Sequence, residues 1–224
     1  MKVILNIDTS VETASVSVSK DGVLLSYLKN TIQKDHASFL HNAVNLVLTE
    51  SSLDIKELDA IAVVNGPGSY TGLRVGLSSA KGLCYALNKP LITIGTLNAL
   101  AAAAISSSKE PSSGSALFCP MIDARRMEVY TAIFDDTMTE RIPASALILH
   151  ESSFEKMLTE NNMFFFGSGS VKWRNMINSK KAYFVDAVDA TAAICQLSHT
   201  KYLNNDFSNL SYCEPLYVKE FFSP

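Results

Sequence analysis

The sequence has few cysteines, no excess of basic side chains and no long apolar segment. Its 4 cysteines form no C-x-x-C pair and no Cys/His cluster with zinc spacing, so we expect reduced, buried thiols rather than a metal or disulfide framework. A formal charge of −3 excludes a whole-molecule positive field for nucleic acid or anionic lipid. No apolar run approaches the roughly 18–20 residues that cross a bilayer. We therefore expect a cytoplasmic protein without membrane contact.

What is present is the composition of a globular protein. The 224 residues, 47% of them hydrophobic, suffice for one large domain or two small ones. Alternating and helical apolar spacings predict an α/β order for the first half. The predicted elements are strands over 3–8, 14–19 and 23–28, a helix over 36–50, a strand over 60–64, a helix over 71–87, a strand over 91–94 and a helix over 97–105.

The opening pattern returns in the second half. Residues 109–114 have the composition of a linker, and Ile122-Asp123-Ala124 follows it in the place that Ile7-Asp8-Thr9 has in the first half. This predicts a duplicated unit, with domains over 1–108 and 115–224 and the last segment packing back on the first domain. In the second half we expect strands over 117–123, 128–134 and 163–166, and helices over 152–159, around Trp173 and over 186–197.

A glycine-rich loop, N-G-P-G-S-Y-T-G-L-R over 65–74, joins a predicted strand to a helix. Such a loop can direct backbone N–H groups at an anion, and Gly66, Gly68 and Ser69, with Asp8 nearby for a hydrated Mg²⁺, are the candidate nucleotide or anion site. It is not a Walker A loop, because no Gly-Lys-Ser/Thr ends it. In the structural alternative the loop is a tight turn, and Ser69 or Thr71 caps the helix.

The helix after this loop has small residues at a spacing of four. Gly72, Gly76 and Ala80 need a reason, because glycine within a helix costs roughly 1 kcal/mol relative to alanine. Close approach of another helix, from the same chain or from a partner, is the natural reason. The helix over 36–50 is apolar on more than one side, which favours a partner. The interface candidates are Phe39, Leu40, Ala43, Gly72, Leu73, Gly76, Ser79 and Ala80.

Catalytic and metal sites are not predicted. His36 and His41 are five residues apart, which places them roughly 140° apart around a helix, so they cannot share one ion. Asp8 and Asp123 follow strands and could hold Mg²⁺ beside a nucleotide, or could simply accept hydrogen bonds in their own turns. No Ser-His-Asp order or G-x-S-x-G motif occurs.

Five segments together resemble the bacterial TsaB (YeaZ) family of tRNA threonylcarbamoyladenosine biosynthesis proteins. They are Ile7-Asp8-Thr9-Ser10, the loop over 65–74 continuing to Gly82, the stretch 122–130, Gly167-Ser168-Gly169 and Pro215-Leu216-Tyr217. The resemblance implies an actin/sugar-kinase-like fold of two duplicated ribonuclease-H-like subdomains, the second reduced. Members are similar to TsaD, the threonylcarbamoyl transferase. TsaD binds its metal partly through H-x-x-x-H, which is absent here, since His36 and His41 are one residue further apart.

The resemblance also implies a function without catalysis by this chain. The first two helices would bind and stabilise TsaD and form a homodimer when TsaD is absent. The ATPase TsaE would join the pair, with ATP or ADP bound only where the subunits meet and tRNA reached only through the complex. Three alternatives stay open. One is an ATP-dependent small-molecule or protein kinase that uses Asp8 for Mg²⁺ and the glycine loops for ATP. The others are a metallopeptidase, or an inactive peptidase-like homodimer since the histidine spacing offers no metal site, and a structural homodimer with no pathway partner.

Overall fold

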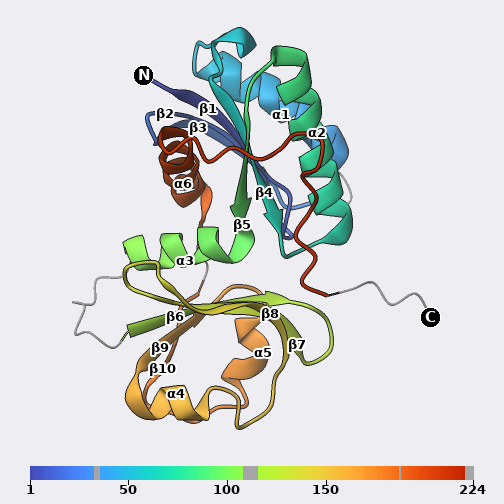
Figure 1. The fold of residues 1–224 in the computed structure, drawn as a ribbon. Coiled ribbons are helices and arrows are strands. Elements are labelled where there is room, and N and C mark those ends of the chain that lie inside the picture. The colour runs from blue at the N-terminus through green and yellow to red at the C-terminus, as the bar shows by residue number, and fades with distance from the viewer. Residues whose placement is uncertain (33–35, 108–115, 187, 220–224) are drawn as a thin grey trace. The chain divides into compact units, whose positions relative to one another are not determined.

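The computed structural model describes residues 1–32, 36–107, 116–186 and 188–219, and the linker predicted over 109–114 lies outside the described residues. The chain divides into two units, one of Met1–Thr96 with Thr191–Leu216 and the other of Leu97–Ala190 with Tyr217–Pro224 (Figure 1). None of the described helices is both long enough and apolar enough to span a membrane.

Unit 1 is built on a five-stranded sheet with the order β3-β2-β1-β4-β5. The strands are β1 (Val3–Asp8), β2 (Ala14–Lys20), β3 (Val23–Asn30), β4 (Ala60–Gly66) and β5 (Leu91–Gly95). β1, β2 and β3 form an antiparallel meander, whose last turn uses Asp21 and Gly22 at φ +50° and +79°. β4 lies parallel to β1 and β5 parallel to β4, because each is reached through a helical crossover.

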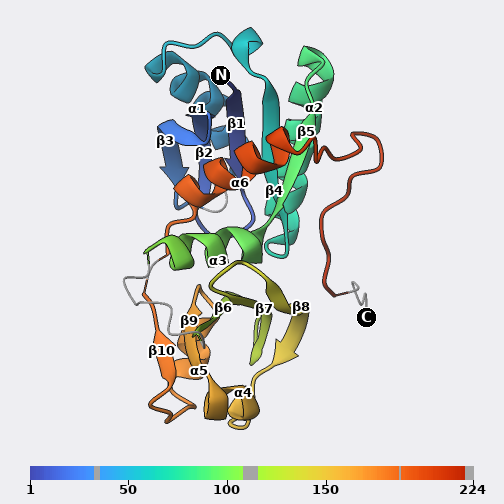
Figure 2. The same cartoon turned by 60° about the vertical axis from the view of Figure 1, so that its left-hand side comes forward.

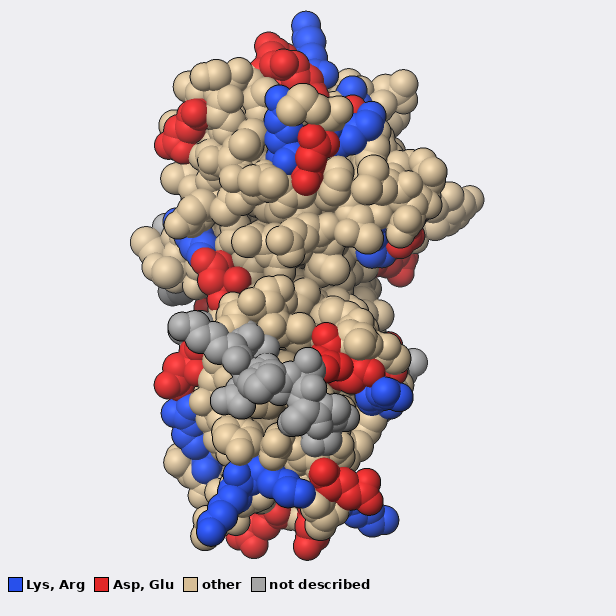
Figure 3. Space-filling view, turned by 90° about the vertical axis from the view of Figure 1, so that its left-hand side faces the viewer, with Lys and Arg blue, Asp and Glu red and all other residues tan. Residues whose placement is uncertain are grey.

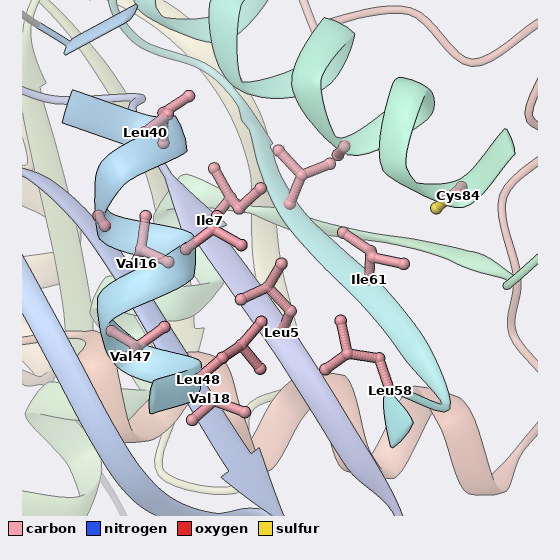
Figure 4. Close-up of a cluster of buried hydrophobic side chains, with 14 of the residues drawn as sticks. Leu5, Ile7, Val16, Val18, Leu40, Val47, Leu48, Leu58, Ile61 and Cys84 are labelled. Atoms are coloured by element: carbon pink, nitrogen blue, oxygen red, sulfur yellow. The ribbon is translucent and has the colours of Figure 1, made fainter. Parts of the chain in front are cut away.

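Helices cover both faces of this sheet (Figure 2). α1 (His36–Glu50) and α2 (Tyr70–Leu87) lie on one face, and α6 (Thr191–Leu203) lies across the other; a short 3₁₀ turn (Ile55–Glu57) precedes β4. On the first face, Leu5, Ile7, Val16 and Val18 pack against apolar side chains of α1 that include Val47 (Figure 4). This is the main core of unit 1.

The face beneath α6 is polar, although it is buried. Asn6 and Ser17 alternate with the apolar residues of β1 and β2, and the Nδ2 of Asn6 and the hydroxyl of Ser17 each lie 3.6 Å from the sulfur of Cys195 in α6. Asn6 also donates to the Ser19 hydroxyl at 3.2 Å. The serines and Cys195 are small, so a helix can approach this face closely, and their hydrogen bonds offset the cost of burying polar groups.

Unit 2 repeats the topology of unit 1. Its strands are β6 (Ala116–Asp123), β7 (Glu128–Asp135), β8 (Glu140–Ile148), β9 (Asn162–Phe166) and β10 (Ala182–Phe184), and its helices are α3 (Thr96–Ser107), α4 (Glu155–Glu160) and α5 (Ser170–Arg174). The order β8-β7-β6-β9-β10 matches β3-β2-β1-β4-β5 strand for strand, with the same antiparallel meander and parallel additions. The duplicated α/β fold is thereby confirmed.

The second copy is reduced in its helices rather than in its sheet. α4 and α5 have 6 and 5 residues, whereas α1 and α2 at the corresponding places have 15 and 18. The core of unit 2 is aromatic instead: Trp173 is fully buried, and its ring lies 4.5 Å from that of Phe165 and 5.2 Å from that of Phe154.

Three expectations about the second half need correction. The domain boundary near residue 108 is too late, because Leu100 and Ala104 of α3 pack with Phe118 and Phe166 of unit 2. The helix expected over 186–197 is α6, which begins at Thr191 and ends at Leu203. The strands β8 and β10 were not predicted. β8 contains Pro143, which a strand tolerates at a sheet edge.

Candidate functional site

The glycine-rich loop closes onto the turn that follows β1. The Ser69 amide donates to the Ser10 carbonyl at 2.7 Å, and a Cβ at Gly68 would overlap that same carbonyl oxygen. The Ser69 hydroxyl accepts from the Gly72 amide at 3.3 Å and caps α2. A Cβ at Gly66 would overlap the carbonyl oxygen of Leu216 in the C-terminal segment. The glycines of this loop therefore allow backbone to approach backbone, as the structural alternative requires.

The two aspartates that could have held Mg²⁺ are engaged in their own turns. The Asp8 carboxylate is buried and accepts from the Ser10 amide at 2.9 Å and from the Ser10 hydroxyl at 2.6 Å. The Asp123 carboxylate accepts from the Arg125 amide and is paired with the Lys172 ammonium, both at 2.6 Å. An ammonium at that distance occupies the place that a cation would take beside Asp123.

Within unit 1, these contacts do not fit a nucleotide. The loop amide of Ser69 and one oxygen of Asp8 already have partners, and the backbone of Ser10 lies where a phosphate would meet Gly68. Asp8, Gly66, Gly68 and Ser69 are brought together by the fold, but they form a packed junction. The candidate nucleotide or anion site in this loop therefore stays a prediction without support from its geometry.

The small-residue face of α2 is turned toward the sheet of its own unit. A Cβ at Gly72 would overlap the Thr9 carbonyl oxygen, and one at Gly76 would overlap the Thr9 hydroxyl. Thr9 is fully buried, and its hydroxyl donates to the Gly72 carbonyl at 2.7 Å. The reason for these glycines is the end of β1, not another helix. Substituting Gly76 would thus disturb the fold before it disturbed any partner.

The other interface candidates differ in how exposed their side chains are. Leu40, Ala43, Leu73 and Ala80 are buried in unit 1, and of the set only Phe39 and Ser79 are partly exposed. The residues buried in this way cannot contact a partner unless the core opens.

Sequence reasoning missed a second stripe of small residues on α2. Ser78, Gly82 and Ala86 are exposed and recur at a spacing of four, and a Cβ at Gly82 would have no heavy atom within 4 Å. Ser78 and Gly82 come two residues after Gly76 and Ala80, a rotation of roughly 200° around the helix axis. The exposed stripe therefore lies on the side of α2 opposite to Gly76 and Ala80. The same spacing rule, applied two residues later, would have found it.

α1 and α2 also carry large apolar side chains that are exposed or partly buried. Leu46 of α1 is 51% exposed and Tyr85 of α2 is 83% exposed. Val75 and Leu83 of α2 are partly buried against the core. The Arg74 guanidinium stacks over the Tyr70 ring at 4.1 Å, at the start of α2.

Metal-binding and thiol chemistry have little basis in the described residues. No group of three or more His, Cys, Asp or Glu side chains there is placed to hold a metal ion. His41 is exposed, and the side chain of His36 lies outside the described residues. Burial raises the pKa of Cys119 and of Cys84 to about 12. Such thiols are poor nucleophiles at neutral pH, because the thiolate is the reactive form.

Charge is distributed in small patches of both signs. On the face shown in Figure 3, basic and acidic side chains are interspersed and wide areas carry neither. This agrees with the net charge of −3 and gives that face no continuous basic surface.

With this geometry in view, the chain can be compared with known proteins. A family model described as "TsaD: tRNA N6-adenosine threonylcarbamoyltransferase" matches residues 30–204. The chain belongs to this family. Its similarity to members named tRNA threonylcarbamoyladenosine biosynthesis protein TsaB confirms the TsaB resemblance. The Haemophilus influenzae protein of that name is 26% identical over 96% of this chain and 93% of its own length. The Bacillus subtilis protein is 28% identical over 78% of this chain and 74% of its own length.

A solved structure supports the fold. A Pseudomonas aeruginosa protein, described as similar to the peptidase YeaZ, superposes with a TM-score of 0.79 at 23% identity over 98% of this chain and 100% of its own. At this identity the likeness concerns the fold alone. The duplicated α/β fold expected from the TsaB resemblance is thus shared with this solved structure over nearly its whole length.

Proposed function

We propose that this chain is a non-catalytic subunit in the threonylcarbamoyladenosine modification of tRNA, where it binds and stabilises the TsaD transferase. The pathway is suggested by relatives that carry the name of tRNA threonylcarbamoyladenosine biosynthesis proteins. The observation that supports a binding role is the exposure of small residues along α2, together with exposed apolar side chains on both α1 and α2.

This surface suits a helix from a partner. Ser78, Gly82 and Ala86 are small and exposed on α2, so the side-chain ridge of another helix could pack closely against them. Leu46 and Tyr85 supply apolar area that is exposed to water in the isolated chain, and large aromatic side chains are frequent anchors at interfaces. Because TsaD belongs to the family whose model matches this chain, its equivalent helices would offer a similar surface.

Further members of the complex follow from the same proposal. In the absence of TsaD, two copies of this chain would pair through the same outward surface. The ATPase TsaE would join the pair, and ATP or ADP would bind where subunits meet rather than at the loop of Gly66–Ser69, where the Ser69 amide and one oxygen of the adjacent Asp8 carboxylate already have partners. tRNA would reach the chain only within the complex.

The experiment is a binding titration of purified TsaD against variants at Gly82. Gly82→Leu adds a bulky side chain at an exposed helical position with free space around it, so the fold should be kept and the helix favoured. Overpacking of a close helix contact costs about 1–3 kcal/mol. We therefore expect TsaD to bind roughly 5- to 150-fold more weakly in isothermal titration calorimetry.

Gly82→Ala is the matched control, since it gains the same helix propensity but adds only one methyl group. Near-normal TsaD affinity of Gly82→Ala with weak binding of Gly82→Leu supports the proposal. Equal affinity of both variants and of the unchanged protein would place the interface elsewhere. Absence of TsaD binding by the unchanged protein would refute the proposed function itself.

A further inference from the structure

The hairpin between β6 and β7 has an unusual tip. Arg125 and Arg126 are consecutive and both have left-handed backbone conformations, at φ +70° and +50°. This region is unfavourable for side chains with a Cβ and is usually occupied by Gly, Asn or Asp. The β2–β3 turn of the same chain meets the same requirement with Asp21 and Gly22. Two arginines at such a tip therefore need a reason other than the turn itself.

Both arginines are exposed, and the acidic groups around them are neutralised by other cations. Asp123 is paired with Lys172 at 2.6 Å, and Glu128 with Lys219 at 2.8 Å. In the part of the chain that the structure describes, no ion pair joins Arg125 or Arg126 to an acidic side chain. Among the described residues, therefore, no carboxylate compensates the two positive charges of the tip, on a protein whose net charge is −3.

The base of the hairpin is fixed while its tip is open to solvent. Lys172 also donates to the Glu128 carbonyl at 3.3 Å, and the Asp123 amide donates to the Ser168 hydroxyl at 3.1 Å. The two strands are therefore tied to the start of α5 on one side and to Lys219 on the other. A rigid support of this kind presents the two guanidinium groups at a defined place, which lowers the entropy lost on binding.

We infer that Arg125 and Arg126 form a phosphate-contacting surface for the backbone of the RNA substrate. Guanidinium groups bind phosphate oxygens with two parallel hydrogen bonds. Phosphates could also come from a nucleotide. An RNA backbone is the better match, because the tip offers long exposed side chains and Asp123 is occupied by Lys172 instead of being available to a metal. This inference rests on the proposed function, which brings tRNA to the complex.

The test uses the complex of this chain with TsaD and an unmodified tRNA transcript. Arg125→Asn combined with Arg126→Gly removes both charges and places turn-forming residues at the tip. We expect the melting temperature of this variant to rise by about 2–8 °C, because the backbone strain is relieved. Its complex should bind the tRNA roughly 10- to 50-fold more weakly near 0.1 M salt, and the slope of log K against log salt should decrease by about 1.4–1.8.

Two further double variants serve as controls. Arg125→Lys with Arg126→Lys keeps the charges and should restore most of the affinity and the salt slope. Lys156→Gln with Lys180→Gln removes two exposed charges elsewhere in unit 2 and should leave both nearly unchanged.

The inference is overturned if the variant with Arg125→Asn and Arg126→Gly binds tRNA with the same affinity, and the same slope of log K against log salt, as the unchanged protein. A variant that keeps tRNA affinity but loses ATP binding by the complex also overturns it, since the phosphates would then be those of a nucleotide. Loss of TsaD binding by this variant alone would make the tip a protein contact and also overturns it. Failure of the proposed function is distinguishable, because it shows as absent TsaD binding by the unchanged protein.

Discussion

Two glycines of α2 should respond in opposite ways to the same substitution. Gly76 lies against Thr9 at the end of β1, whereas a Cβ at Gly82 would have no heavy atom within 4 Å. Both are in the interior of one helix, so alanine gains the same helix propensity at each, about 1 kcal/mol. Any difference between Gly76→Ala and Gly82→Ala must therefore come from packing.

The packing at Gly76 reverses the sign. A methyl group there would overlap the Thr9 hydroxyl, and overpacking of a buried site costs about 1–3 kcal/mol. Moving that hydroxyl also weakens its 2.7 Å bond to the Gly72 carbonyl, a loss of about 0.5–1.5 kcal/mol. After the gain in propensity, Gly76→Ala should destabilise unit 1 by about 0.5–3.5 kcal/mol. Gly82→Ala should stabilise it by about 1 kcal/mol.

Hydrogen exchange of amides in β1 and β4 measures the stability of unit 1. Fluorescence of Trp173, the only tryptophan, reports on unit 2 and should be unchanged in both variants. Thr9→Ala removes the hydroxyl that the methyl group would meet, so the cost of Gly76→Ala should shrink in that background. Equal stabilisation by the two glycine substitutions would refute the argument that Gly76 packs against β1.

Two further predictions concern titratable groups. The Thr137 hydroxyl is the main cause of the lowered pKa of Asp135, with a smaller contribution from Arg141. A carboxyl pKa that is lower in the folded than in the unfolded state stabilises the fold at pH values above the unfolded-state pKa of about 3.9. Asp135→Asn should therefore reduce the free energy of unfolding at pH 7, and the difference from the unchanged protein should shrink as the pH falls below about 4. Urea titration followed by Trp173 fluorescence measures this. Cys213 should react fastest with a thiol reagent at pH 8. Burial raises the pKa of all four thiols, to about 12 for Cys84 and Cys119, but only Cys213 is half-buried and the other three are buried, so they are also shielded from the reagent.

The fold of the first half could be predicted from local pattern because each element there has a clear period. The helix over His36–Glu50 was predicted to the residue, since its apolar positions repeat with helical spacing. α6 shows the contrary case. It lies on the polar layer of Asn6 and Ser17, so its buried positions are not distinctly apolar and its limits were misplaced.

The candidate site was less predictable, because a spacing does not say which side of a helix faces inward. Close approach of another helix was expected at Gly72, Gly76 and Ala80, but the group that lies against the two glycines is Thr9 of the same chain, and Ala80 belongs to the apolar core of unit 1. Sequence alone could not show this, since the contact joins residues 63 or more positions apart. Burial, which only the folded structure provides, separates this stripe from the exposed one at Ser78, Gly82 and Ala86.

The internal duplication indicates why a partner surface would belong to the first copy. At about 1.5 Å per residue, α1 and α2 are roughly 22 and 27 Å long, whereas α4 and α5, of 6 and 5 residues, reach about 9 Å or less. A long helix can bury one side against its sheet and still present a continuous second side to another helix. α5, by contrast, commits Ser170 and Trp173 to the core and keeps only three residues. Since the two sheets have matching strand order, the length of the helices that follow their meanders is the difference that would favour α1 and α2 over α4 and α5 for the proposed contact with a partner helix.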